Sequence, residues 1–253
     1  MIGIFDSGVG GLSVFREIRK VLPEQSYIYY SDNAHCPYGE KSREYIIDRA
    51  REITRFMLEK GCEVVVVACN TATAAAISTL REEFPVRFIG MEPAVKPAAK
   101  QTRTGVVGVL ATAGTLKATK YMDTRAQWAQ GVRIVEHIGQ GFVELVERGI
   151  VDGPVAERTV SASLRPLLEA GADTIVLGCT HYPFLTATIL KVAAETVPDR
   201  AVAVIDPAPA VAKHLVDVMR QENIPLEAAE GYAVELHASG SPDALERTFS
   251  TLL

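Results

Sequence analysis

Two cysteines in this chain follow short apolar runs and are themselves followed directly by polar residues. Cys69 comes after VVVVA, and Cys179 comes after TIVLG. A lone cysteine is often an inert, buried hydrophobic residue. Polar neighbours on both cysteines favour reactive thiols, because the ionised thiolate is the form that attacks carbon, binds metal or accepts a proton. The four polar neighbours are Asn70, Thr71, Thr180 and His181.

The two cysteine segments are copies of one pattern. Residues 59–71 (EKGCEVVVVACNT) align without a gap on residues 169–181 (EAGADTIVLGCTH), at a shift of 110 positions (179 − 69). A glycine, a buried apolar run and a cysteine recur in the same order. We therefore predict two related halves, each of which places one cysteine where a strand ends and a helix begins.

The end of such a strand is a position at which ligands bind. In open α/β sheets, ligands bind outside the carboxyl ends of the strands. The next helix offers free N–H groups and the positive end of its dipole, and both stabilise a thiolate. The alanine-rich segment after Cys69 predicts a helix start, and Pro183 suits the first turn of a helix after Cys179.

Short β-branched runs alternate with longer amphipathic stretches along the whole chain. Continuous apolar strands that alternate with helices indicate parallel sheets covered on both faces. The predicted fold is α/β: two similar doubly wound parallel-sheet domains related by a pseudo-twofold axis, with the active site in the cleft between them. Strands are expected at about 2–5, 27–30, 63–68, 86–89, 105–110, 132–137, 174–178 and 202–205.

Prolines help to place the helices and the domain boundaries. Helices are expected at 41–60 and 154–170, and Pro166 should kink or interrupt the second. The proline-containing segments MEPAVKPAAK and DPAPA mark the crossings between domains. The tail, with a helix near 208–222, a strand near 231–237 and a helix near 242–252, returns to the first half. The predicted domains are 1–95 plus 208–253, and 96–207.

Composition excludes several classes of protein. The 253 residues are 48% hydrophobic and 23% charged, which is an ordinary globular balance. A net charge of −5 without a long basic run argues against a nucleic-acid or anionic-membrane surface. The N-terminal sequence MIGIFDSG does not resemble a signal peptide, and no apolar run reaches the roughly 20 residues of a transmembrane helix. We therefore expect a cytoplasmic protein, in which thiols stay reduced.

The other strand ends carry further candidates. Asp6 and Ser7 close the first strand, and the GxGG that follows predicts a tight turn rather than a dinucleotide fingerprint. After the second strand, Asp32, Tyr38 and Gly39 could line a pocket. We interpret Cys36 and Cys62 as structural or incidental, because neither has a partner in the repeat, and we place His35 in a surface loop.

The second half lacks a copy of Asp6, since Ala111 stands at the equivalent position. An acid or base must then come from His181 or from Glu147 in FVELVERG. Two thiols that face each other across a small cleft suit inversion at a carbon that bears hydrogen. One group removes the proton from one face, and the other group delivers a proton to the opposite face of the planar intermediate.

Six motifs together resemble the glutamate racemase family of the aspartate/glutamate racemase superfamily. They are FDSGVGGLSV, PYGEKS, ACNTATA, GMEPAVKPA, FVELVERG and LGCTHYPFL, and the resemblance runs from Ile4 to about Asp206. It implies a cofactor-independent interconversion of L- and D-glutamate that supplies D-glutamate for peptidoglycan. It also implies that Cys69 acts on D-glutamate and Cys179 on L-glutamate, with no metal and no pyridoxal phosphate.

The resemblance further assigns roles to individual side chains. It implies that Asp6, Glu147 and His181 assist the two thiols. His181 differs from the glutamate that related aspartate racemases usually carry after GCT. Gln140 and Gly141 replace a Cys-Pro pair that many relatives have before the FVxLVE stretch. The implied substrate-binding residues are Asp6, Ser7, Tyr38, Gly39, Asn70, Thr71, Thr180 and His181.

Three other interpretations of the residues stay open at this stage. A racemase or isomerase for aspartate or another small acid is the nearest. A nucleotide-binding oxidoreductase would need a complete glycine fingerprint. A zinc module built on Cys69, Cys179 and His181 lacks the four closely spaced ligands of a structural site. The family resemblance adds the expectation of a homodimer that binds a small molecule and no nucleic acid or membrane.

Overall fold

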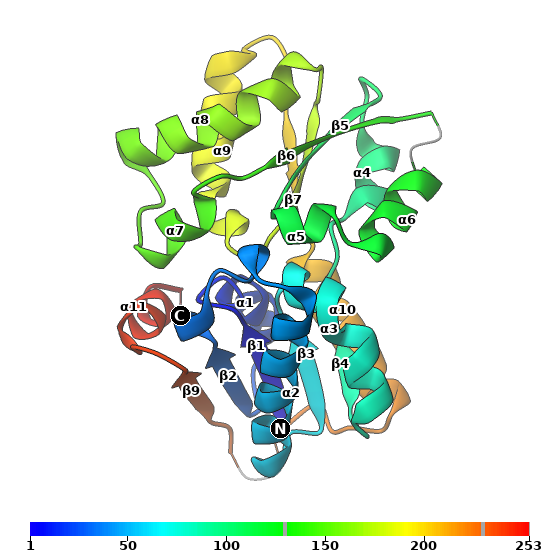
Figure 1. The fold of residues 1–253 in the computed structure, drawn as a ribbon, viewed down its shortest axis with the longest axis vertical. Coiled ribbons are helices and arrows are strands. Elements are labelled where there is room, and N and C mark those ends of the chain that lie inside the picture. Colours follow the sequence, from blue (N-terminus) through cyan, green and yellow to red (C-terminus); the bar gives the residue numbers. More distant parts are fainter. Residues whose placement is uncertain (129–130, 229–230, 253) are drawn as a thin grey trace. The chain divides into compact units, whose positions relative to one another are not determined.

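The computed structural model describes residues 1–128, 131–228 and 231–252. The chain forms two compact units, shown in Figure 1 (blue to cyan with orange to red, and green to yellow). Unit 1 comprises Met1–Met91 and Ala208–Leu253, and unit 2 comprises Glu92–Pro207. The sequence placed the first crossing at 95/96 and the second at 207/208. The division into two domains at these bounds stays a prediction.

Unit 1 is built on a five-stranded parallel sheet with the strand order β4-β3-β1-β2-β9. Short 3-10 turns at Asn33–His35 and Tyr38–Glu40 follow the second strand. The elements are β1 (Ile2–Asp6), α1 (Leu12–Val21), β2 (Tyr27–Ser31), α2 (Arg43–Glu59), β3 (Val64–Val67), α3 (Asn70–Glu83), β4 (Arg87–Ile89), α10 (Ala208–Gln221), β9 (Val234–Ala238) and α11 (Asp243–Leu252).

Unit 2 is built on a four-stranded parallel sheet with the strand order β6-β5-β7-β8. A 3-10 turn at Tyr182–Leu185 follows β7. The elements are α4 (Val95–Gln101), β5 (Val106–Ala111), α5 (Ala113–Leu116), α6 (Thr119–Trp128), β6 (Arg133–Ile138), α7 (Phe142–Glu147), α8 (Gly153–Glu169), β7 (Thr174–Gly178), α9 (Thr186–Thr196) and β8 (Ala203–Ile205).

The internal repeat predicted from the sequence is confirmed by both units. Starting from β8, the second sheet has the order β8-β7-β5-β6, which corresponds strand by strand to β4-β3-β1-β2. Helices α2 and α8 both have 17 residues and are related by the same shift of 110. Both end at a glycine with positive φ, 82° at Gly61 and 102° at Gly171, a conformation that favours glycine. The predicted α/β class with two similar parallel sheets is confirmed.

Helices cover both faces of the first sheet, as Figure 1 shows. Helix α2 buries one stripe at helical spacing, Ile46, Ala50, Ile53 and Met57. This stripe and the buried face of α3 share one hydrophobic cluster with strand residues such as Val65. On the opposite face, α1 packs against α10. The strands β1 and β3 are wholly buried, which explains their continuous apolar sequences.

Two local predictions differ from the structure. Helix α8 continues through Pro166 to Glu169, so the predicted interruption is wrong. Pro166 lies in the last turn, where the missing N–H removes a single bond to the carbonyl of Ala162. The last strand begins at Val234 rather than near residue 231.

Candidate active site

Cys69 lies at the junction of β3 and α3. It is the N-cap residue of α3, and its Sγ accepts a hydrogen bond from the Ala72 N–H at 3.4 Å. The thiol lies 4.0 Å from the Ser7 Oγ, to which it donates, and only 5% of the residue is exposed. Because the N-terminus of a helix carries a partial positive charge, this position favours the thiolate. The predicted start of a helix at Cys69 is confirmed.

The turn after β1 packs tightly beside Cys69. Asp6 is fully buried, and its Oδ1 accepts the Gly8 N–H at 2.8 Å. A Cβ on Gly11 would lie 2.7 Å from the Cβ of Asp6 and 2.8 Å from the hydroxyl of Tyr29. Glycine is therefore required here by close approach rather than by a left-handed backbone. The turn holds Asp6 and Ser7 rigidly at the carboxyl end of β1.

Asn70, directly after Cys69, is buried without hydrogen bonds to its side chain. It is 3% exposed, and within the described part of the chain neither its amide nitrogen nor its carbonyl oxygen has a partner. An unsatisfied buried amide costs about 1–3 kcal/mol, so native proteins rarely keep one without a reason. A polar ligand that supplies the missing bonds would provide that reason. Thr71 is also buried at this end of α3.

Tyr38 and Gly39 lie in the second 3-10 turn after β2. The buried Tyr38 hydroxyl donates to Oδ2 of Asp32 at 2.5 Å. Burial raises the pKa of Tyr38, and the negative charges of Asp32 and of ionised Cys69 raise it further, so the phenol stays protonated. Asp32 itself receives a two-pronged contact from Arg49 of α2. Sequence reasoning missed Arg49, although its position three residues after Ile46 borders the apolar stripe of α2.

Cys179 follows β7 in unit 2 and is 7% exposed. The 3-10 turn Tyr182–Leu185 comes next, and the α-helix begins only at Thr186. The predicted position of Pro183 in the first turn of a helix after Cys179 is confirmed, but this first turn is a 3-10 turn and the α-helix follows it. Cys179 thus lacks the N-cap position of Cys69, and its polar surroundings come from side chains instead.

The nearest of these side chains belong to His181 and Glu147. Nδ1 of His181 lies 3.8 Å from Sγ of Cys179, and Nε2 of His181 lies 2.7 Å from Oε1 of Glu147. His181 is 1% exposed. A carboxylate that accepts the Nε2 proton leaves the Nδ1 lone pair directed at the thiol. This chain of contacts can take a proton from Cys179 or return one to it.

Helix α7 brings Glu147 to this position. Its N-cap residue is Gly141, whose φ of 78° lies in the left-handed region. The replacement of Cys-Pro by Gln140 and Gly141 therefore leaves an intact helix that ends at Glu147. Phe142 anchors the helix by an edge-on contact with Tyr182, with ring centroids 4.9 Å apart.

The remaining cysteines differ from Cys69 and Cys179. Cys62 is buried beside Gly3, and burial raises the pKa of its thiol to about 11. A thiol that stays protonated in the core agrees with its structural interpretation. Cys36 is partly exposed, and the neighbouring His35 contacts the hydroxyl of Tyr45 through Nδ1.

The predicted site residues fall into two groups, one in each unit. Each group combines a buried cysteine with polar side chains that follow parallel strands, except that Glu147 comes from the end of α7 and, like Gly39, is only partly buried. The group in unit 1 is Asp6, Ser7, Tyr38, Gly39, Cys69, Asn70 and Thr71, and the group in unit 2 is Glu147, Cys179, Thr180 and His181.

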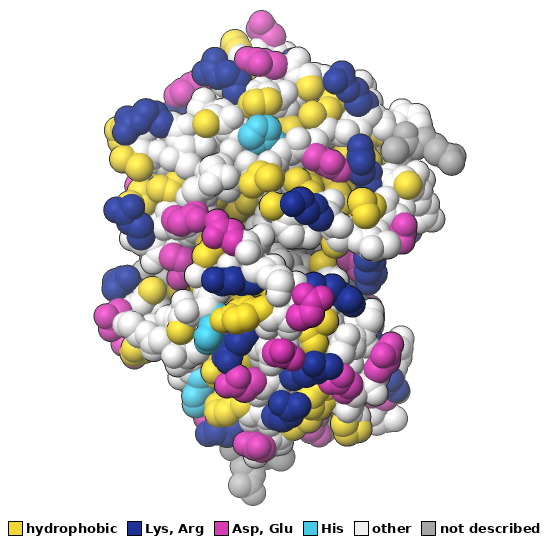
Figure 2. All heavy atoms as spheres, in the orientation of Figure 1, with side chains coloured by type: hydrophobic (Ala, Val, Ile, Leu, Met, Phe, Trp, Pro, Cys, Tyr) yellow, Lys and Arg dark blue, Asp and Glu magenta, His cyan; other side chains and the backbone are white. Residues whose placement is uncertain are grey.

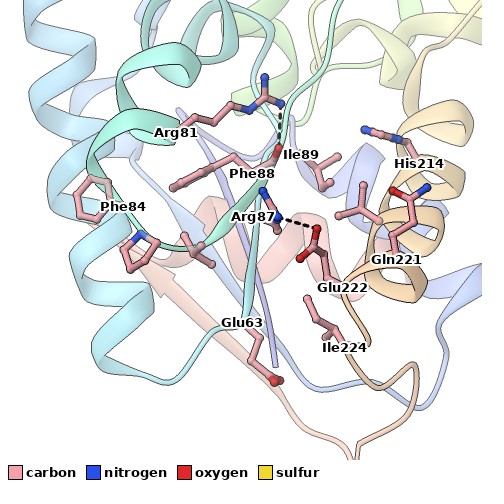
Figure 3. Close-up of a pocket in the computed structure, with 13 residues that line it drawn as sticks. Glu63, Arg81, Phe84, Arg87, Phe88, Ile89, His214, Gln221, Glu222 and Ile224 are labelled. Carbon is pink, nitrogen blue, oxygen red and sulfur yellow. Dashed lines mark hydrogen bonds and ion pairs between the residues drawn. The ribbon is translucent and has the colours of Figure 1, made fainter.

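A cavity of about 780 Å³ in unit 1 lies away from these groups, along the outer edge of β4 (Figure 3). Its walls come from α3, β4 and α10, and none of the predicted site residues lines it. Its arginines already have partners: Arg87 pairs with Glu222 at 2.8 Å, and Arg81 donates to the carbonyl of Phe88 at 3.0 Å. The cavity therefore adds no residue to the candidate active site.

The surface carries charges of both signs. On the face shown in Figure 2, acidic and basic side chains are interspersed. Among the described residues, no helix combines the length and the apolar character needed to cross a membrane.

Residues 3–215 match the model of the Asp/Glu/Hydantoin racemase family. The chain belongs to this family. With the relatives described next, this membership confirms the expected enzyme class, an amino-acid racemase.

Individual relatives place the chain among the glutamate racemases of this family. It is 46% identical to the glutamate racemase of Ectopseudomonas mendocina (strain ymp), over 100% of this chain and 94% of the relative. The crystal structure of Escherichia coli glutamate racemase in complex with L-glutamate and the activator UDP-MurNAc-ala superposes with a TM-score of 0.85. That protein is 35% identical, and the match covers 99% of this chain and 93% of the other.

A second structure contains the opposite enantiomer. Glutamate racemase from Francisella tularensis subsp. tularensis SCHU S4, in complex with D-glutamate, matches with a TM-score of 0.83 and 25% identity. The match covers 100% of this chain and 92% of the other.

Proposed function

We propose that this racemase interconverts L- and D-glutamate without a cofactor, by proton transfer at Cα between two thiols. The observation that carries the proposal is the equivalence of Cys69 and Cys179. Both are buried, and both follow the same strand of a repeated unit. Each thiol also contacts a polar side chain, Ser7 for Cys69 and His181 for Cys179. The repetition of one cysteine site suits a reaction that treats two mirror-image substrates alike.

In the proposed reaction, one thiolate removes the Cα proton from one face of the substrate. The electron pair of the C–H bond is delocalised into the adjacent carboxyl group, and the second thiol donates its proton to the opposite face. The roles of the thiols exchange in the reverse direction. Cys69 acts on D-glutamate, with help from Asp6, and Cys179 acts on L-glutamate, with help from His181 and Glu147.

The groups around each thiol support this division of work. On the Cys69 side, the N-terminus of α3 favours the thiolate directly. On the Cys179 side, the imidazole of His181, supported by the carboxylate of Glu147, can accept the proton of the thiol. The two half-sites therefore tune equivalent thiols by different means.

The substrate is proposed to bind through buried polar side chains and backbone N–H groups near the cysteines. Asn70 is the strongest candidate, because its buried amide has both a donor and an acceptor to offer. L-glutamate and D-glutamate in two related structures support glutamate as the substrate. The other proposed binding residues are Asp6, Ser7, Tyr38, Gly39, Thr71, Thr180 and His181.

We further propose a cytoplasmic role as the source of D-glutamate for peptidoglycan, and a homodimeric enzyme. The names of the relatives support the enzyme's place in amino-acid metabolism.

A substrate panel tests the choice of amino acid. Purified protein without added cofactor is incubated with each enantiomer of glutamate, aspartate and glutamine, and optical rotation is followed. Loss of rotation with both enantiomers of glutamate, and far slower loss with aspartate, is the expected result. A faster reaction with aspartate would replace the proposal by the alternative of an aspartate racemase.

A further inference from the structure

Arg49 makes a buried contact that the proposed mechanism does not yet use. It points from α2 to the carboxyl end of β2, where its Nη2 lies 2.8 Å from Oδ1 of Asp32 and its Nε lies 3.0 Å from Oδ2. Asp32 is fully buried, and 13% of the Arg49 side chain is exposed. The third nitrogen, Nη1, donates to Glu52 at 2.5 Å. A planar fork of this kind fixes a carboxylate in both position and orientation.

The fixed carboxylate in turn holds Tyr38. Oδ2 of Asp32 accepts the Tyr38 hydroxyl proton at 2.5 Å. Tyr38 belongs to the same hydrophobic cluster as Cys69 and Ala72, at the start of α3. After burial and Asp32, the charge of an ionised Cys69 contributes to the raised pKa of Tyr38, as two negative charges close to each other repel. A chain of contacts thus leads from the edge of α2 to the neighbourhood of the Cys69 thiol.

We propose that Arg49 is a positioning residue for the Cys69 half-site: by keeping Asp32 ionised and oriented, it fixes Tyr38 beside the thiol. The inference rests on the proposed racemase function. It adds a residue outside the six motifs, one that acts through Asp32 and Tyr38 and touches no substrate.

The electrostatics of Asp32 explain why Arg49 is needed. Burial alone pushes the pKa of Asp32 upward, but hydrogen bonds from Arg49, Tyr38 and Ser239 outweigh burial and hold it below its usual value. Without the guanidinium, a fully buried carboxylate would lose its main counter-charge and would take up a proton at a higher pH. A protonated Asp32 would no longer hold the Tyr38 hydroxyl in the same way.

Ionisable groups other than Arg49 also surround Asp32, and apart from Tyr38 in one variant they stay in place in the test below. His35 Nε2 lies 4.0 Å from Oδ1, so an imidazole alone cannot replace the forked contact. The groups that face Asp32 from β2, from the 3-10 turns and from α2 are Tyr30, His35, Tyr38, Arg49 and Glu52.

Three variants test the inference. Arg49→Met keeps the length of the side chain and removes the charge, whereas Arg49→Lys keeps the charge and removes the fork. Arg51→Met is the matched control, because Arg51 lies on the same helix but pairs only with the surface carboxylates of Asp48 and Glu83. Circular dichroism first establishes that each variant is folded.

Kinetic measurements with glutamate then give two readouts. Arg49→Met should lower kcat/KM by about 10- to 100-fold, since misplacement near a reacting group has effects of this size. The loss must be equal for both enantiomers, because their free energies are equal. In Arg49→Met, the acid limb of the pH profile of kcat/KM should also shift to higher pH by at least about one unit. In Arg49→Lys, this limb should stay near its position in the wild type.

Several outcomes would overturn the inference. One is a folded Arg49→Met variant with the pH profile and rate of Arg51→Met. If Arg49→Met does not fold, the inference stands or falls on Arg49→Lys combined with Tyr38→Phe. If the effect of the double variant on kcat differs from the sum of the two single effects, Arg49 acts through Tyr38. Effects that simply add contradict the inference.

The proposed function can fail separately. A wild type that does not racemise glutamate would refute it directly. The inference would then be decided by the pH dependence of Cys69 alkylation, which should differ between Arg49→Met and Arg51→Met, and coincident curves would overturn it.

Discussion

Glu147 and His181 form a carboxylate–imidazole contact of 2.7 Å that aims the other imidazole nitrogen at Cys179. The contact joins the end of α7 to the turn after β7, two segments that are 34 residues apart in the sequence. A histidine fixed in this way has one defined tautomer and can exchange a proton with the thiol. In the proposed mechanism, this pair gives the half-site in unit 2 the proton acceptor that Asp6 is proposed to provide in unit 1.

Removal of the Glu147 charge should slow racemisation. In Glu147→Gln the imidazole loses its negatively charged partner, so we expect kcat to fall by about 10- to 100-fold with a smaller change in KM. Glu144→Gln is the matched control, since Glu144 lies on the same helix and is exposed. Steady-state kinetics in both directions measure the effect. Equal rates for the two variants would show that Glu147 does not assist Cys179.

Substitution of Asn70 should weaken substrate binding without weakening the free protein. Asn70→Ala removes a buried amide that makes no hydrogen bond in the described chain, so the free energy of unfolding should stay level or increase by about 1 kcal/mol. The KM for glutamate should rise about tenfold, and glutamate should raise Tm less than in the wild type. Asn33→Ala provides the contrast, because Asn33 bonds to Ser241 and Gly240 and its loss should destabilise the fold. A marked loss of stability in Asn70→Ala would refute a role in binding alone.

Asp173 should contribute stability that depends on pH. Burial raises its pKa. Hydrogen bonds from Thr102 at 2.6 Å and from the N–H groups of Arg103 at 2.7 Å and Thr104 at 3.0 Å lower the pKa by more than burial raises it, so the net pKa is below the usual value. A carboxylate with a lowered pKa stabilises the folded state above about pH 4, and this contribution is lost as the pH falls through its folded pKa. Asp173→Asn should therefore reduce the free energy of unfolding by about 1–3 kcal/mol at neutral pH and flatten its decline in acid.

Urea denaturation at several pH values measures both effects of this substitution. Asp123→Asn, at an exposed position of α6, should leave the curve unchanged. An Asp173→Asn curve that runs parallel to the wild type across acidic pH would contradict the assignment.

Cys62 should resist alkylation in the folded protein. Its thiol has a pKa of about 11, raised by burial, so only about one molecule in a thousand carries the thiolate near pH 8. Iodoacetamide followed by peptide mass spectrometry should modify Cys62 only after unfolding, whereas the partly exposed Cys36 should react in the native state. Rapid labelling of native Cys62 would show that it is not a core residue.

The repeat made much of the fold predictable from the sequence. The shift of 110 residues between EKGCEVVVVACNT and EAGADTIVLGCTH corresponds to two 17-residue helices, two left-handed glycines and two equivalent sheet orders. Buried parallel strands have continuous apolar sequences, so their positions could be predicted within a residue or so. Local geometry was harder to predict, because Pro166 in a last turn and Pro183 in a 3-10 turn have no distinct sequence signature.

The residues of the candidate site were predictable where they are joined to a motif. Asp6 lies two residues before Gly8, Cys69 follows a buried apolar run, and His181 lies two residues after Cys179, so each is close to a sequence feature that marks the end of a strand. Arg49 is different, because a single arginine on an amphipathic helix has the pattern of a solvent-exposed charge. Only the three-dimensional contact with Asp32 distinguishes it from Arg51, two residues further along.

The most direct test of the two-thiol account is the exchange of the Cα proton in variants that each lack one cysteine. Wild type, Cys69→Ala, Cys179→Ala and the control Cys62→Ala are each incubated in D2O with one enantiomer of glutamate and no cofactor. Wild type and Cys62→Ala should yield a racemic mixture with deuterium at Cα in the product, and neither Cys69→Ala nor Cys179→Ala should racemise glutamate. Full racemisation by either of these two variants would contradict the account.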